Sequence, residues 1–266
     1  MMGKKSLLCC VLCAVLLFSA CTGPKQEPET AAVELPKDAP LDPASHPVFL
    51  DDQDALDAAY AAIADKLPMG EHSNLYIDEN NSVQYNNHHD GDEAFDTKPS
   101  EKQAVEAAVE KLEELGLAPT GEYRTKVSFV ERYTVIGLDG GDFADPETVE
   151  YTVIFYRMFN GADMVSDSED GIIISFDVYG ITELRYKWRN IQVTEDAPFI
   201  AVDFATQEQA KGIYLSLAND PPADPVIKAA YLQRGDVVTP IWVCSPDGQF
   251  GHHILLDMNT GEQIVL

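Results

Sequence analysis

Residues 151–190 decide the predicted fold, and they read YTVIFYRMFNGADMVSDSEDGIIISFDVYGITELRYKWRN. Turn residues divide this stretch into three apolar runs, 151–159, 172–178 and 184–189, which predict a strand meander. The first run is apolar on both faces, as is typical of a central strand that is covered on both sides. Asn160–Gly161 ends this run with a dipeptide that favours a tight turn. Gly180 permits the second reversal.

The third run alternates with a period of two, which predicts a half-buried antiparallel strand. Its apolar face carries Leu184, Tyr186 and Trp188. Its other face carries three cations that we expect in solvent: Arg185, Lys187 and Arg189. Two interpretations follow. The cations pair with acidic neighbours such as Asp177, or they form a docking stripe for an anionic partner.

The N-terminal sequence predicts a localisation outside the cytoplasm. Lys4 and Lys5 precede the apolar run Leu7 to Phe18, which is too short for a transmembrane helix and indicates a signal peptide over residues 1–20. Leu17-Phe18-Ser19-Ala20-Cys21 resembles the bacterial lipobox, which implies that Cys21 carries lipid on the extracytoplasmic face of the cell membrane. Phe18 departs from the usual leucine. The alternative is ordinary cleavage and a secreted, soluble chain.

Residues 21–50 are rich in proline and predict an extended tether. Of the cysteines, Cys9, Cys10 and Cys13 leave with the signal peptide. Cys244, in the run Ile241-Trp242-Val243-Cys244, is expected to be a buried small hydrophobe.

The net charge of −27 argues against binding to nucleic acid or to anionic lipid, since both favour basic faces. The length suits two domains, which we place at 51–195 and 196–266. Residues 51–98 belong to the first domain or form an incomplete extra unit.

Three amphipathic helices are predicted before strand-rich stretches. The first spans Asp51 to Leu67, and the other two begin at capping boxes at Ser100 and Thr206. A hairpin follows over 237–258, with a last strand at 263–266. Two strands end alike, each with an aspartate before a glycine turn: Asp177 with Gly180, and Asp257 with Gly261.

A helix followed by a curled antiparallel sheet resembles PepSY-like domains. The residues that carry this resemblance are Pro240, Ile241, Trp242, Val243, Leu256, Asp257, Thr260, Gly261 and Glu262. The central stretch, with Phe155, Asn160–Gly161, Gly171, Phe176–Asp177 and Gly180, is similar to tandem domains of the YycH/YycI type. The resemblance implies an α+β fold of two PepSY-like (cystatin-like) units, each a helix packed on a curled sheet. It also implies an extracellular regulator without catalysis. Those regulators are held by a transmembrane helix, whereas this leader ends in a lipid-type cysteine.

Candidate chemistry is sparse. His88, His89 and Asp90, with Asp92, form a metal-like cluster in the segment Asn80 to Asp96, which reads as a loop. Asp163, Asp167, Glu169 and Asp170 form an acidic loop that lacks the bidentate glutamate of an EF-hand. No nucleophile elbow, phosphate loop or zinc-protease motif occurs.

We therefore expect a lipid-anchored binding or regulatory protein that needs no metal or cofactor and engages a protein or peptide at the cell envelope. The alternatives are a metal-assisted hydrolase that uses His88, His89 and Asp90, and a small-solute receptor.

Overall fold

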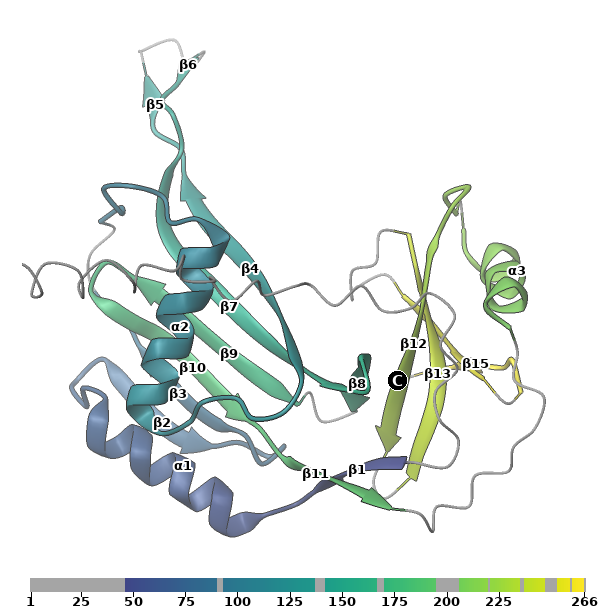
Figure 1. The fold of residues 1–266 in the computed structure, drawn as a ribbon. Coiled ribbons are helices and arrows are strands. Elements are labelled where there is room, and N and C mark those ends of the chain that lie inside the picture. The colour runs from purple at the N-terminus through teal and green to yellow at the C-terminus, as the bar shows by residue number, and fades with distance from the viewer. Residues whose placement is uncertain are drawn as a thin grey trace, which may run out of the picture. The chain divides into compact units, whose positions relative to one another are not determined.

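The computed structural model in Figure 1 describes residues 46–89, 93–136, 142–166, 170–194, 206–219, 221–234, 237–246, 253–258 and 260–265. The chain divides into the units Met1–Glu34 and Leu35–Leu266, and all described residues belong to the second. The signal peptide, Cys21 and most of the tether lie outside the described residues, so these assignments stay predictions.

The predicted meander is confirmed. Its strands are β7 (Glu147–Phe159), β9 (Gly171–Asp177) and β10 (Gly180–Lys187), and β9 pairs antiparallel with both of the others. Asn160 and Gly161 both have positive φ, 47° and 75°, as the turn requires. β7 is central, because β4 (Tyr123–Arg132) pairs with it on the side away from β9. On the far side of β10, the sheet continues with β3 (Val83–Asn87) and β2 (Ser73–Ile77).

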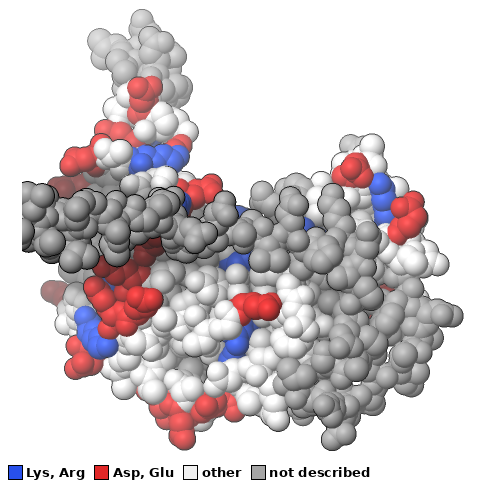
Figure 2. All heavy atoms as spheres, in the orientation of Figure 1, with Lys and Arg blue, Asp and Glu red and all other residues white. Residues whose placement is uncertain are grey.

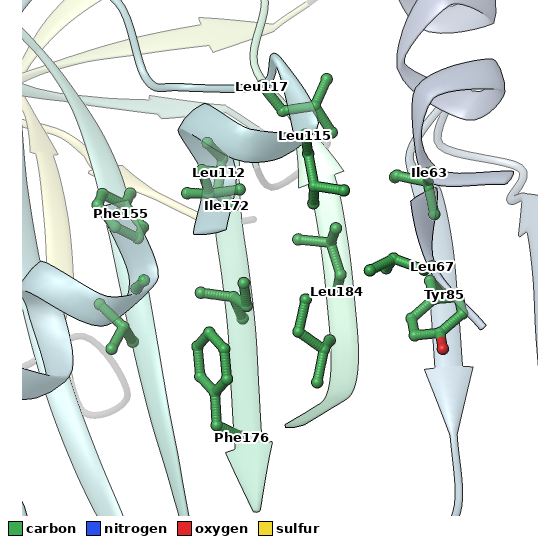
Figure 3. Close-up of a cluster of buried hydrophobic side chains, with 14 of the residues drawn as sticks. Ile63, Leu67, Tyr85, Leu112, Leu115, Leu117, Phe155, Ile172, Phe176 and Leu184 are labelled. Atoms are coloured by element: carbon green, nitrogen blue, oxygen red, sulfur yellow. The ribbon is translucent and has the colours of Figure 1, made fainter. Parts of the chain in front are cut away.

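Helices α1 (Gln53–Lys66) and α2 (Glu101–Leu115) lie on one face of this sheet (Figure 1). The sequence explains their limits. Asp52 caps α1, Ser100 forms the predicted capping box with Gln103, and Gly116 ends α2 with a φ of 77°. Their apolar stripes meet the sheet in one core, in which Figure 3 shows Ile63, Leu67, Leu112 and Leu115 with the strand residues Tyr85, Ile172 and Leu184.

Further strands extend the sheet beyond β7. The strand β8 (Ala162–Ser166) forms a short hairpin with β7 and pairs in parallel with β12 (Val226–Arg234). The predicted hairpin is confirmed as β13 (Val237–Ser245) and β14 (Ile254–Asp257), and β15 (Gln263–Ile264) pairs with β14. Helix α3 (Gln207–Leu217) begins at the predicted Thr206 capping box and packs through Ala210 and Tyr214 near Cys244.

The predicted fold class is wrong. Strands β15, β14, β13, β12, β8, β7, β9, β10, β3 and β2, with β4 beside β7, form one mixed sheet of eleven strands among the described residues. Two helix-on-sheet units would need separate sheets. Instead, the parallel β8–β12 pairing joins the two predicted sheets, and both α1 and α2 pack on the same strands. The division into domains at residues 195 and 196 stays a prediction.

The C-terminal part of the predicted tether is a strand. β1 (His46–Leu50) pairs antiparallel with β11 (Asn190–Thr194), and a second small pairing joins β5 (Val135–Ile136) to β6 (Asp142–Phe143). Pro47 is compatible with this strand although proline has no backbone N–H to donate. In a two-stranded ribbon each strand has one edge without a hydrogen-bonding partner, so the missing N–H can face that edge. No helix in the described part of the chain has the length and apolarity to span a bilayer.

The two similar strand endings use the same local chemistry. The Asp177 Oδ1 atom accepts hydrogen bonds from the backbone N–H groups of Tyr179 and Gly180, at 2.8 and 3.0 Å. The Asp257 Oδ1 atom accepts one from the N–H of Thr260, at 3.2 Å. Gly261 follows with a φ of 71°. Each aspartate therefore fixes the turn after its own strand.

Candidate functional site: the helix-free face of the sheet

The strands that carry α1 and α2 have a second face, which we call the helix-free face. Residues paired across neighbouring strands point to the same side of a sheet. Four of the paired residues on the helix side are wholly buried: Val153, Ile174, Leu184 and Tyr85. The residues next to these along each strand therefore point to the helix-free face.

One continuous row crosses the helix-free face. Lys126 of β4 pairs with Ile154 of β7, Ile154 pairs with Ile173 of β9, and Ile173 pairs with Arg185 of β10. Gln84 and Tyr76 continue the row. Lys126 is exposed, and Ile154, Ile173 and Arg185 are half-buried. We call the four residues Lys126, Ile154, Ile173 and Arg185 the cation–isoleucine row.

Beside this row lies a polar row. It consists of Ser128, Thr152, Ser175, Glu183, Asn86 and Asn74. The hydroxyls of Thr152 and Ser175 lie 2.8 Å apart in a hydrogen bond, and the Asn86 amide donates to the Asn74 side chain at 3.2 Å. Polar groups therefore replace apolar ones along the middle of this sheet face, where Ser175 is buried and the two ends of the row, Ser128 and Asn74, are exposed.

Acidic groups lie beyond the polar row. Burial raises the pKa of Glu150, and the nearby charges of Glu183 and Asp177 raise it further, against a hydrogen bond from Thr182. The helix-free face is thus polarised, with cations in the cation–isoleucine row and carboxylates in and beyond the polar row.

Tyr156 and Arg124 flank the cation–isoleucine row. The Arg124 guanidinium lies 3.9 Å from the centre of the Tyr156 ring, and it forms two hydrogen bonds with the Asp163 carboxylate, at 2.6 and 3.1 Å. Burial raises the pKa of Tyr156. This stacked arrangement holds Arg124 in place at the border of the row.

The three predicted cations do not form one exposed stripe. Arg185 is half-buried on the helix-free face, but Lys187 is only 5% exposed and donates to the Asn80 carbonyl oxygen at 2.5 Å. Burial lowers the pKa of Lys187, against the nearby charge of Asp170. The expectation of solvent exposure is therefore wrong for Lys187.

Arg189 follows the interpretation in which cations pair with acidic neighbours. It forms hydrogen bonds with both oxygens of Asp170, whose side chain is 1% exposed, and with Asp51 at 2.9 Å. Its guanidinium also lies 4.6 Å from the centre of the Phe49 ring. A role in partner binding for Arg185, Lys187 and Arg189 stays a prediction.

The metal-like cluster is only partly described. Asp90 and Asp92 lie outside the described residues, and His88 is exposed. The His89 Nδ1 atom lies 2.6 Å from Asp177 Oδ2, and its Nε2 atom lies 2.8 Å from the Asn87 amide nitrogen. Both ring nitrogens of His89 are therefore engaged in hydrogen bonds. Within the described ranges no group of three or more histidine, cysteine or acidic side chains is placed to hold a metal ion.

Several other predicted residues have structural roles. Asp163 lies in β8 rather than in a loop, and both Asp163 and Asp170 bind arginine. Asp167 and Glu169 lie outside the described residues. Cys244 is wholly buried, as expected, and burial raises its pKa to about 12. The predicted loop Asn80 to Asp96 contains β3.

Sequence reasoning missed Lys126, Ile154, Ile173 and Tyr156 as a surface. The available signal was the period-two alternation of 123–130, in which exposed and half-buried side chains alternate along much of β4. The row itself exists only through the register of four strands, which local patterns do not specify.

No family model and no curated protein matches the sequence. Among solved structures, the crystal structure of YycH from Bacillus subtilis matches with a TM-score of 0.42 and 10% sequence identity. The match covers 80% of this chain and 52% of that chain, so this chain spans about half the length of YycH. No comparison identifies a PepSY-like unit in this chain. At this level of similarity neither a family nor a shared activity is established.

Proposed function

We propose that this chain is a lipid-anchored, extracytoplasmic binding or regulatory protein that engages a protein or peptide partner at the cell envelope and catalyses no reaction. The helix-free face carries the proposal, because it combines half-buried isoleucines, cations and a polar row on one side of the sheet. Such mixed surfaces are typical of non-obligate protein interfaces. The leader sequence that ends at Cys21 supports the lipid-anchored, extracytoplasmic localisation.

Fractionation of bacterial cells tests the anchor. The wild-type chain should sediment with membranes and be released by detergent, because two acyl chains give stable insertion. Cys21→Ser should move the mature chain to the soluble extracytoplasmic fraction. Wild-type protein that is found in the soluble fraction would contradict the anchor.

Site-specific photo-crosslinking in cells tests the binding. A photoreactive residue at Ser128, which is exposed on the helix-free face, should give a defined adduct with an envelope protein. The matched control is Glu110, which is exposed on α2, on the other side of the sheet. Adducts of equal yield at both positions, or none at either, would count against a binding surface on the helix-free face.

A further inference from the structure

The cation–isoleucine row has a defined length. Lys126 and Arg185 lie three strand spacings apart, with Ile154 and Ile173 between them. Because neighbouring strands lie about 4.8 Å apart, the two cationic positions are separated by about 14 Å at the backbone. The row therefore presents two positive groups with an apolar centre.

We propose that the cation–isoleucine row binds an extended, acidic segment of the partner protein, with two carboxylates that flank an apolar side chain. This inference rests on the proposed binding function and names the chemistry of the partner. In an extended chain, residues i and i+4 point to the same side and lie about 14 Å apart, which matches the row. In an α-helix the same residues lie only about 6 Å apart.

The net charge of the molecule repels an acidic segment, so the binding of such a segment depends on the local cations of this row. The chain carries 45 acidic and 18 basic residues. In Figure 2, which views the side of α1 and α2, acidic side chains gather over these helices. That side repels a carboxylate-rich segment, whereas the row offers cations at both ends. Lys126 and Arg185 lie at the two ends of the row, and they are therefore the proposed anchors.

The half-buried isoleucines explain why the partner segment also needs an apolar residue. Ile154 and Ile173 are paired neighbours in the middle of the row, and each retains part of its surface in solvent. Covering such apolar area contributes about 25 cal/mol per Å². An apolar side chain at position i+2 of the extended segment would lie over this pair.

Fluorescence anisotropy with a synthetic peptide tests the proposal. The probe contains Glu-Thr-Val-Thr-Glu between short Gly-Ser flanks, and the control peptide has lysine for both glutamates. The protein is the full mature chain with Cys21→Ser. We expect saturable binding of the acidic probe only, and at least a tenfold rise in Kd for the double variant Lys126→Glu/Arg185→Glu.

The matched control is Lys102→Glu/Lys111→Glu on α2, which changes the net charge equally but lies on the other side of the sheet. It should change Kd less than twofold. The milder double variant Lys126→Gln/Arg185→Gln should raise Kd at least threefold. It replaces the charge-reversal variant as the test if charge reversal prevents folding.

Three outcomes would overturn the proposal: no binding of the acidic probe, equal losses in the row and control variants, or row-dependent binding to phosphatidylglycerol vesicles without peptide binding. The last would assign the row to a membrane surface. In each case a crosslinked adduct at Ser128 would leave the proposed binding function standing, so the two failures are distinguishable.

Discussion

At the scale of the residue, the same type of side chain has different roles at neighbouring positions. Arg185 reaches the helix-free face, Lys187 is buried against the β2–β3 turn, and Arg189 is held by two aspartates. A period-two pattern predicts the side of the sheet on which a residue lies. It does not predict what covers that side, and the carbonyl of Asn80 comes from a turn far away in the sequence.

The two aspartates that bind Arg189 should contribute very unequally to stability. Asp170→Asn should lower the free energy of unfolding by about 3 kcal/mol, because it leaves a largely buried guanidinium without its main counter-charge. Asp51→Asn should cost less than about 0.5 kcal/mol, since that carboxylate side chain is 83% exposed. Urea denaturation of the purified protein measures both. Equal losses would show that burial does not determine the strength of these pairs.

At the scale of the element, sequence reasoning predicted the three helices that the described residues contain and missed several strands. The helices have local signals, namely capping residues at Ser100 and Thr206 and a terminal Gly116. β12 has no such signal: residues 230–233 are all buried, so no alternation is visible. The short β8 is polar enough to resemble a loop. Its parallel pairing with β12 connects distant residues, and this non-local pairing is what made the predicted fold class wrong.

Helix α2 should owe its position to its buried stripe rather than to its own propensity. Leu112 is wholly buried between the helix and the sheet, so Leu112→Ala should lower the free energy of unfolding by roughly 2–5 kcal/mol. Glu110→Ala on the exposed side of the same helix should change it by less than about 0.5 kcal/mol. Thermal or urea unfolding gives both values. A small effect at Leu112 would mean that α2 does not cover the sheet as described.

At the scale of the whole molecule, the sequence predicted the cellular address and the class of function separately from the fold. The leader and its cysteine are local features, so these assignments do not depend on the two-unit architecture, and they stay predictions. The candidate binding surface could not be predicted, because Lys126 and Arg185 are brought together only by the register of β4, β7, β9 and β10. Prediction therefore failed where long-range strand pairing is required.

The number of reactive thiols should report on lipidation and on packing together. If lipid occupies Cys21, the mature chain keeps Cys244 as its one thiol, because the other cysteines leave with the signal peptide. Cys244 is wholly buried, and burial raises its pKa to about 12. At pH 8, therefore, a thiol reagent cannot reach the sulfur atom in the folded protein, and the thiol is not ionised to the reactive thiolate. We therefore expect no labelled thiol in the native protein and one after denaturation, measured by intact mass. Cys244→Ala is the control and should give none in either state. One labelled thiol in the native protein and two after denaturation would mean that Cys21 carries no lipid. One labelled thiol in both states would mean that Cys244 is not packed in the core.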